Sequence, residues 1–143
     1  MPSFAAFKSS FDGDIVTPDH PDYPSAIKRW ANNASRHAKI VAFVKNPHDV
    51  SLAVKYAKES DLPLAIRGGG HNPAGSSSSE GIVIDLSRYL NDCRVDTEKR
   101  LAYVGGGAIW ETVDKAAIKH GLAAVAGTVN HVGTLLIYTS VYC

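Results

Sequence analysis

Three consecutive glycines followed by a histidine and an asparagine form the most chemically informative segment of the chain. The segment at residues 67–72 reads Arg-Gly-Gly-Gly-His-Asn and follows an apolar stretch at residues 64–66 that is typical of a β-strand. Because glycine has no Cβ, such a turn can adopt positive φ values and bring its backbone N–H groups close to an anion. His71 would then hold a nucleophilic ring nitrogen beside that anion.

The spacing of these glycines differs from that of the common nucleotide-binding loops. A P-loop ends in Gly-Lys-Ser or Gly-Lys-Thr, and this segment has no lysine. The dinucleotide fingerprint G-x-G-x-x-G is absent from residues 68–75, and no clear helix pattern follows. Taken alone, the segment is about equally consistent with a flexible surface loop that carries a histidine by chance. A single Arg-Gly-Gly element is weak evidence for RNA binding.

The residues around the glycine turn predict an α/β unit that positions it. A right-handed strand–helix–strand crossover would place the turn at the C-terminal end of a strand, where α/β sheets bind ligands. Pro47 and Asp49 suit the first turn of the helix. The serines at residues 76–79 are interpreted as a flexible linker. In chain order, the predicted elements are a strand at 41–44, a helix from 46 to about 61, and strands at 64–66 and 82–86.

The second half of the chain predicts a hairpin, a helix and a returning strand. A second triple-glycine segment, at residues 105–107, precedes the helix, and Gly121 is a suitable C′ residue for it. In chain order, the predicted elements are strands at 92–96 and 100–104, a helix from about 108 to 120, and a strand at 123–126 that leads into residues 127–131.

Several short motifs occur in an order and spacing that point to one family. The most specific combination is Arg-Gly-Gly-Gly-His at residues 67–71 with Ile-Asp-Leu-Ser at residues 84–87. The other matching positions are Tyr23, Trp30, 40–44, 49–50, Gly75, 105–108, Trp110, 120–122 and 127–131. From about residue 23 to residue 133, the chain resembles the N-terminal part of the flavin-binding domain of the vanillyl-alcohol-oxidase and p-cresol-methylhydroxylase (PCMH) type, in the berberine-bridge-like branch.

The resemblance implies an α+β fold, namely a PCMH-type FAD-binding domain that is incomplete. It would contain a small α/β subdomain with a parallel sheet and the start of a second, mixed α+β subdomain. We therefore expect an N-terminal arm at residues 1–22, a partial PCMH-type FAD-binding domain at residues 23–133 and a divergent C-terminal tail at residues 134–143. The family continues after Gly133 with a glycine-rich stretch, whereas this tail has no glycine and reads as a strand.

The same resemblance implies FAD as the cofactor and assigns its contacts. The N–H groups of residues 68–70, with Asn72, would hold the FAD diphosphate, and a ring nitrogen of His71 would be joined to the 8α-methyl of the isoalloxazine. Val129 stands where doubly linked members carry a cysteine, so the linkage would be single. Arg67 would pair with the diphosphate or with a nearby acid, and the sequence leaves both open. The candidate cofactor-binding residues are Arg67, Gly68, Gly69, Gly70, His71, Asn72, Gly75, Gly127, Thr128, His131 and Gly133.

The function implied is that of the FAD-binding portion of a flavin-dependent oxidoreductase. Such an oxidase would oxidise an alcohol, amine, sugar or related small molecule and pass the electrons to dioxygen. We expect weak or no FAD binding and no turnover from this polypeptide alone, because the family's remaining FAD cleft and substrate domain have no counterpart in it. The alternative is a non-catalytic truncated remnant that binds no flavin. No residue is assigned a catalytic role, and the sequence indicates neither a substrate nor an oligomeric state.

Composition and charge limit the other classes of partner. The net charge of +1 provides no basic field for nucleic acid, and no apolar stretch has the length of a membrane span or a signal peptide. A cytoplasmic location is the corresponding expectation. The six histidines are not grouped with cysteines or carboxylates at ligand spacing, so no metal site is expected.

Individual side chains are expected to have structural roles. Asp85 is expected to cap the turn that follows its strand, and Trp110 to belong to the core. Cys93, in a predicted strand, is expected to be a small buried apolar residue.

Overall fold

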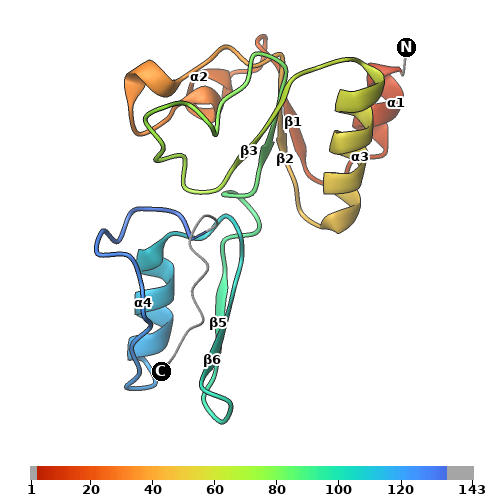
Figure 1. Cartoon of the computed structure of the whole chain (residues 1–143). Helices are drawn as coiled ribbons and strands as arrows, with labels where there is room; N and C mark the ends of the chain where they lie inside the picture. The colour runs from red at the N-terminus through yellow and green to blue at the C-terminus, as the bar shows by residue number, and fades with distance from the viewer. Residues whose placement is uncertain (1–2, 135–143) are drawn as a thin grey trace.

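A mixed four-stranded sheet with the order β1-β2-β4-β3 organises the first half of the chain. The computed structural model describes residues 3–134, and Figure 1 shows them as two α+β units. In the first unit β2 (Ile40–Phe43), β4 (Ile82–Asp85) and β3 (Leu64–Arg67) are parallel, whereas β1 (Asp14–Val16) pairs antiparallel with β2. The predicted α/β subdomain is confirmed, and β1 adds an antiparallel edge strand that the sequence did not reveal.

The two central strands of this sheet, β2 and β4, are buried along their whole length. Their sequences, Ile-Val-Ala-Phe and Ile-Val-Ile-Asp, are the nearly continuous apolar runs that a parallel strand needs when both of its faces are covered. The register sets Arg67, the last residue of β3, beside Asp85, the last residue of β4. The glycine turn follows Arg67 directly and therefore begins at the C-terminal edge of the sheet.

Helices cover the two faces of the sheet unequally. Helices α1 (Phe4–Ser9) and α3 (Pro47–Glu59) lie on one face, whereas α2 (Tyr23–Ile27) lies on the other and is followed by the short 3₁₀ helix η1 (Asn32–Ala34) (Figure 1). On the first face the rings of Phe7 and Tyr56 stack with their centroids 4.4 Å apart. The buried residues on this face are Phe7, Phe11, Ile15, Ile40, Ala42, Val44, Ala53, Ala57, Ile82 and Ile84.

Helix α3 begins where the sequence predicted, because its first turn is capped by side chains. The Asn46 side chain accepts a hydrogen bond from the Asp49 amide at 2.9 Å, and Pro47 occupies the start of the helix. The Asp49 carboxylate is fully buried and accepts hydrogen bonds from the amides of Asp12 and Lys45, each at 2.9 Å. One carboxylate thus ties the loop before β1 to the loop that enters α3.

The second unit contains the predicted hairpin and helix. Strands β5 (Cys93–Asp96) and β6 (Leu101–Val104) pair antiparallel, and α4 (Trp110–Ile118) packs against them. Trp110 is 1% exposed and belongs to the core, as predicted. Gly121 has a φ of +67°, the left-handed conformation expected of a residue that ends a helix.

The strand predicted at residues 123–126 does not form. No strand of the described part of the chain runs beside these residues, and a strand needs such a partner. The segment that follows instead pairs with the start of α4, where the amide of Trp110 donates to the carbonyl of Val132 at 3.0 Å. The prediction rested on apolar composition alone, which does not supply a neighbouring strand.

Two further predictions about side chains are wrong. The serine segment is not a flexible linker, because Ser77, Ser78 and Ser79 are all less than 9% exposed and the Ser79 hydroxyl donates to the Pro63 carbonyl at 2.7 Å. Cys93 is only partly buried in β5, although this burial still raises the pKa of its thiol. The predicted strand character of the C-terminal tail concerns residues 135–143, which lie outside the described residues.

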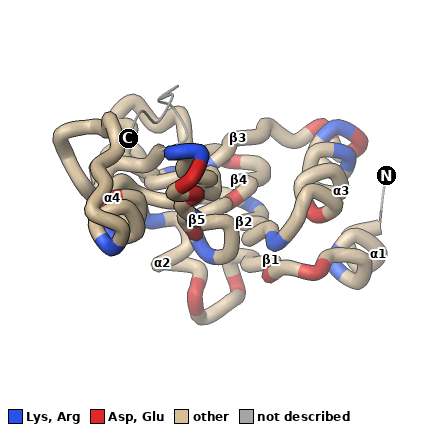
Figure 2. Tube along the Cα trace, turned by 90° about the horizontal axis from the view of Figure 1, so that it is seen from below, with Lys and Arg blue, Asp and Glu red and all other residues tan. Residues whose placement is uncertain are grey.

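The surface carries charges of both signs around both units. Figure 2 shows Lys and Arg residues interspersed with Asp and Glu along the trace. No helix within residues 3–134 is long and apolar enough to cross a bilayer. The same residues contain no group of three His, Cys, Asp or Glu side chains arranged to hold a metal ion.

We predict that Asp49→Ala destabilises the chain by about 2–4 kcal/mol, because it leaves two amides near the core without an acceptor at about 1–3 kcal/mol each. Urea unfolding, monitored by circular dichroism, measures this change in the free energy of unfolding. The matched control is Lys55→Ala on the exposed face of α3, where the side chain is 71% exposed and its ion pair with Glu59 spans 3.9 Å. This control should cost about 0.5 kcal/mol or less. Equal stabilities for the two variants would contradict the role given to Asp49.

Candidate functional site

The glycine turn after β3 presents a row of backbone N–H groups that have no partner. Within residues 3–134, no backbone or side-chain atom accepts a hydrogen bond from the amides of Gly68, Gly69, Gly70 or His71. Gly68 and Gly70 are buried, and Gly70 has a φ of +68°. An unpaired buried N–H group is costly, and successive N–H groups in such a turn form an anion-binding nest. The turn is therefore built for an acceptor from outside the described chain.

A second loop, residues 127–133, approaches this turn most closely at Gly133. A Cβ atom placed on Gly69 would lie 2.5 Å from the backbone nitrogen of Gly133, and one placed on Gly133 would lie 2.5 Å from the nitrogen of Gly69. Only two glycines allow backbones to approach so closely. Gly133 also forms a β-bridge with Ile109, just before α4. The contact therefore joins the end of β3 to the beginning of α4.

His71 packs against two other aromatic rings at this junction. Its ring stacks on Trp30, with centroids 4.3 Å apart and an interplanar angle of 20°, and its centroid is 4.8 Å from that of His131. Trp30 is 63% exposed, so the stack lies at the surface of the molecule. The Nε2 atom of His71 is buried and has no hydrogen-bond partner in the described part of the chain. Packing, and not a hydrogen bond to its own loop, therefore holds the imidazole.

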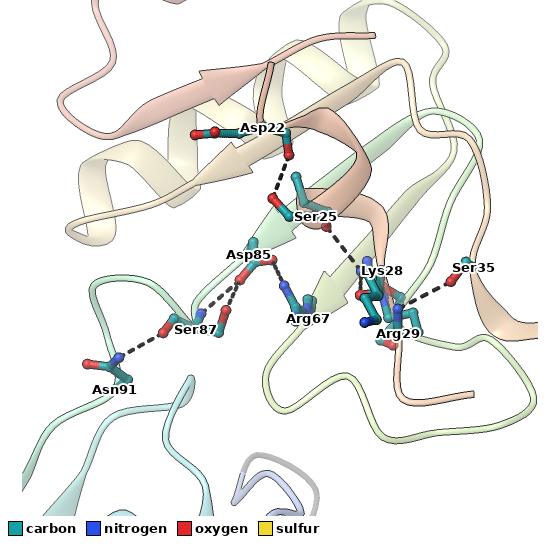
Figure 3. A network of polar contacts seen from close by, with 11 residues as sticks. Asp22, Ser25, Lys28, Arg29, Ser35, Arg67, Asp85, Ser87 and Asn91 are labelled. Atoms are coloured by element: carbon teal, nitrogen blue, oxygen red, sulfur yellow. Dashed lines mark hydrogen bonds and ion pairs between the residues drawn. The ribbon is translucent and has the colours of Figure 1, made fainter. Parts of the chain in front are cut away.

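An ion pair fixes the strand from which the turn emerges. Nη1 of Arg67 lies 2.7 Å from Oδ2 of Asp85, which is fully buried (Figure 3). The other carboxylate oxygen accepts hydrogen bonds from the amide of Ser87 at 2.9 Å and from its hydroxyl at 2.6 Å. Of the two partners that the sequence left open for Arg67, the structure shows the acid. The predicted capping role of Asp85 is confirmed.

Arg29 is a component of this region that the sequence did not reveal. Its side chain is 3% exposed, and its Nε and Nη2 atoms donate to the Ser77 carbonyl at 3.0 and 2.8 Å. Nη1 donates to the carbonyls of Ala26 at 3.2 Å and Lys28 at 2.9 Å. Burial and, to a lesser degree, the Arg67 charge lower the pKa of Arg29 to about 10, so the group remains charged at neutral pH. In the sequence it sits in a Lys-Arg-Trp run and resembles an ordinary solvated residue.

The remaining predicted residues belong to the two loops but form no hydrogen bond to the amides of the turn within residues 3–134. The Asn72 side-chain oxygen accepts from the Ala74 amide at 2.8 Å, and the Asn72 carbonyl accepts from the Gly75 amide at 3.3 Å. Asn72 and Gly75, whose φ is +81°, thus shape the loop after His71. Gly127 is partly buried and Thr128 is exposed, and the described residues form no hydrogen bond between them and the glycine turn.

Comparison with known proteins connects this geometry to a cofactor. The family model described as an FAD binding domain matches residues 38–136. This chain belongs to that family. A relative, the (R)-6-hydroxynicotine oxidase of Paenarthrobacter nicotinovorans, is 35% identical over 134 residues, which cover 93% of this chain and 29% of the oxidase. An FAD-linked oxidoreductase of Bacillus subtilis is 37% identical over 88% of this chain and 28% of its own length.

Solved structures show the same fold. The 6-hydroxy-D-nicotine oxidase of Arthrobacter nicotinovorans superposes with a TM-score of 0.82 at 35% identity, covering 86% of this chain and 27% of the oxidase. The berberine-bridge-like protein 1 of Physcomitrella patens superposes with a TM-score of 0.83 at 19% identity, covering 92% of this chain and 29% of that protein. The predicted family, its PCMH-type α+β fold and its cofactor FAD are therefore confirmed. The chain spans less than a third of the length of these relatives.

The residues of the turn fit the diphosphate of FAD. Its oxygens are acceptors, and the turn offers consecutive N–H donors that the described chain does not use. The close approach of Gly69 and Gly133 leaves no room for a side chain where the two loops meet. When bound, the flavin supplies the redox chemistry, whereas the protein supplies binding, orientation and electrostatics.

We predict that Gly69→Ala and Gly133→Ala each destabilise the chain by about 1–3 kcal/mol, because the new methyl group forces the two backbones apart. Because both changes break one contact, the double variant should lose less stability than the sum of the single losses. Urea unfolding of the three variants measures this coupling. Ala74→Ser, at an exposed position of the same loop, is the control and should leave stability unchanged. Additive losses would show that the two glycines do not share a contact.

Proposed function

We propose that this chain supplies the diphosphate-binding turn and the flavin-linking histidine of an FAD-dependent oxidase. The observation that carries the proposal is the set of N–H groups at Gly68, Gly69, Gly70 and His71 that are unpaired within residues 3–134 and lie at the C-terminal ends of the parallel strands. The family match to an FAD binding domain supports it. The substrate class is an alcohol, amine, sugar or related small molecule, and dioxygen accepts the electrons.

His71 is proposed to be the point of covalent attachment. A ring nitrogen would bond to the 8α-methyl carbon of the isoalloxazine, and the imidazole N–H and one methyl C–H bond would break. The two protons and two electrons released would convert dioxygen to hydrogen peroxide, which balances the step. The rings of Trp30 and His131 both pack against the imidazole, so little ring motion remains to be lost when the bond forms. Val129 offers no sulfur for a second link.

The other candidate residues are proposed to shape and close the same site. Asn72 and Gly75 set the course of the loop that leaves His71. Gly127, Thr128 and Gly133 would bring the second loop against the cofactor. Arg67 would act indirectly, because its ion pair with Asp85 fixes the strand from which the turn emerges.

Turnover is proposed to require protein beyond the described residues. The relatives are more than three times as long as the segment that matches this chain. We expect the isolated chain to bind FAD weakly and to oxidise no substrate. The identity of the substrate would be set by residues outside the segment that this chain shares with them.

We predict that His71→Ala abolishes acid-stable flavin. The chain and the variant are refolded with excess FAD in air, precipitated with acid and examined by absorbance and intact mass. The wild type should gain the mass of one FAD, and the variant should gain none. His120→Ala, at an exposed position after α4, is the matched control and should label like the wild type. A wild type that stays colourless and binds no flavin would favour the non-catalytic remnant, and labelling of His71→Ala would place the link elsewhere.

A further inference from the structure

Arg29 carries a buried charge that forms no ion pair with a carboxylate within the described residues, although Asp85 acts on it from a distance. Its side-chain donors all meet carbonyl oxygens, those of Ser77, Ala26 and Lys28. Carbonyl oxygens satisfy the hydrogen bonds of a guanidinium but not its charge, and a buried charge without a counter-ion is destabilising. The resting protein therefore contains a positive charge that a bound anion would stabilise.

The side chain that carries this charge packs against the glycine turn. A Cβ atom placed on Gly70 would be 3.3 Å from Cδ of Arg29 and 2.9 Å from Nε of Arg67. The carbonyl of Gly70 also accepts a hydrogen bond from the Trp30 amide at 3.2 Å, which links the turn to the residue after Arg29. The turn is thus flanked by the two arginine side chains, and Figure 3 shows both side chains in the same region.

Among residues 3–134, one carboxylate is bonded to either of these two cations. Asp85 is bonded to Arg67 at 2.7 Å, and its second oxygen is occupied by Ser87. Nε of Arg67 is itself buried without a partner in the described part of the chain. Two guanidinium charges and one carboxylate leave an excess of one positive charge beside the unpaired amides.

We propose that Arg29 is a positioning residue for the diphosphate, acting through its charge from behind the glycine turn without touching the ligand. This inference rests on the proposed function. It adds that the anion is held by a buried cation as well as by the N–H groups. In a partly buried site the charge acts through a medium of lower dielectric constant than water, so its effect extends over several ångströms.

A purely structural role for Arg29 predicts a different result. In that case the guanidinium would only link the carbonyls of Ala26 and Lys28, at the end of α2, to the serine segment, and its charge would not affect anion binding. The two roles are separated by variants that keep or remove the charge. Arg29→Lys keeps the charge and a donor for a carbonyl, whereas Arg29→Met keeps much of the side-chain volume and removes the charge.

The experiment measures the affinity of the full 143-residue chain for inorganic pyrophosphate by NMR titration. We expect Arg29→Met to bind about tenfold more weakly, equivalent to about 1.4 kcal/mol. Arg29→Lys should stay within about threefold of the wild type, because it preserves the charge. Arg94→Met in β5 removes the same charge from the other unit and should bind like the wild type. Amide spectra of each variant establish that it is folded before its affinity is compared.

Two results from folded variants would overturn the inference. One is an Arg29→Met affinity equal to that of the wild type, and the other is an Arg29→Lys affinity as low as that of Arg29→Met. If Arg29→Met fails to fold, the Nε–H signal of Arg29 in the wild type tests the inference instead. We expect it to shift with the glycine amides on adding pyrophosphate, while the Arg94 signal stays fixed. An unmoved Arg29 signal would overturn the inference.

The proposed function and this inference fail in different ways. If the wild type binds neither FAD nor pyrophosphate, the proposed function fails and the role of Arg29 fails with it. If the wild type binds both and Arg29→Met binds them equally well, only the role of Arg29 is overturned.

Discussion

The close approach of two glycine backbones, Gly69 and Gly133, is the constraint on which the rest of the site depends. It brings the end of β3 against the loop that precedes the tail, with no space for a side chain between them. The same contact brings the centroid of the His131 ring within 4.8 Å of that of His71. A wider gap would separate the turn from the second loop, and the imidazole would lose one of the two rings that hold it.

The polar groups around this contact are divided between folding and binding. Arg67 and Asp85 satisfy each other at the ends of paired strands, so they fix the base of the turn. Within residues 3–134, the amides of the turn, the Nε2 atom of His71 and the charge of Arg29 have no such partners. A protein selected only for stability would pair these groups, since each unpaired buried polar group costs about 1–3 kcal/mol. Their concentration in one place is the physical signature of a binding site.

The features predicted from sequence were those encoded by local pattern. The apolar runs of β2 and β4, the cap of α3 and the positive φ of Gly121 each depend on a few adjacent residues. The features that were missed depend on contacts between distant residues. Residues 123–126 are apolar enough for a strand, but no strand among residues 3–134 runs beside them. In the sequence Arg29 resembles a surface residue, and only the folded chain brings the distant Ser77 carbonyl to its guanidinium.

The candidate site shows the same division. The triple-glycine turn and His71 were evident from their sequence, and the family resemblance supplied the cofactor. The choice between two partners for Arg67 required the strand register, because Asp85 lies next to it only when β3 and β4 are aligned. The burial of the serine segment was hidden for a related reason, since serine is mostly exposed in proteins and the bond from Ser79 to the distant Pro63 carbonyl exists only in the folded chain.

The most direct test of the account is a ¹H–¹⁵N NMR titration of the wild-type chain with FAD. The account predicts that the amide signals of Gly68, Gly69, Gly70 and His71 move further than any others, and that Gly121, which lies at the far end of α4, does not respond. Because the experiment reads each N–H group separately, weak binding is sufficient. Glycine-turn amides that stay in place while FAD shifts signals elsewhere, or that never respond at any FAD concentration, would contradict it.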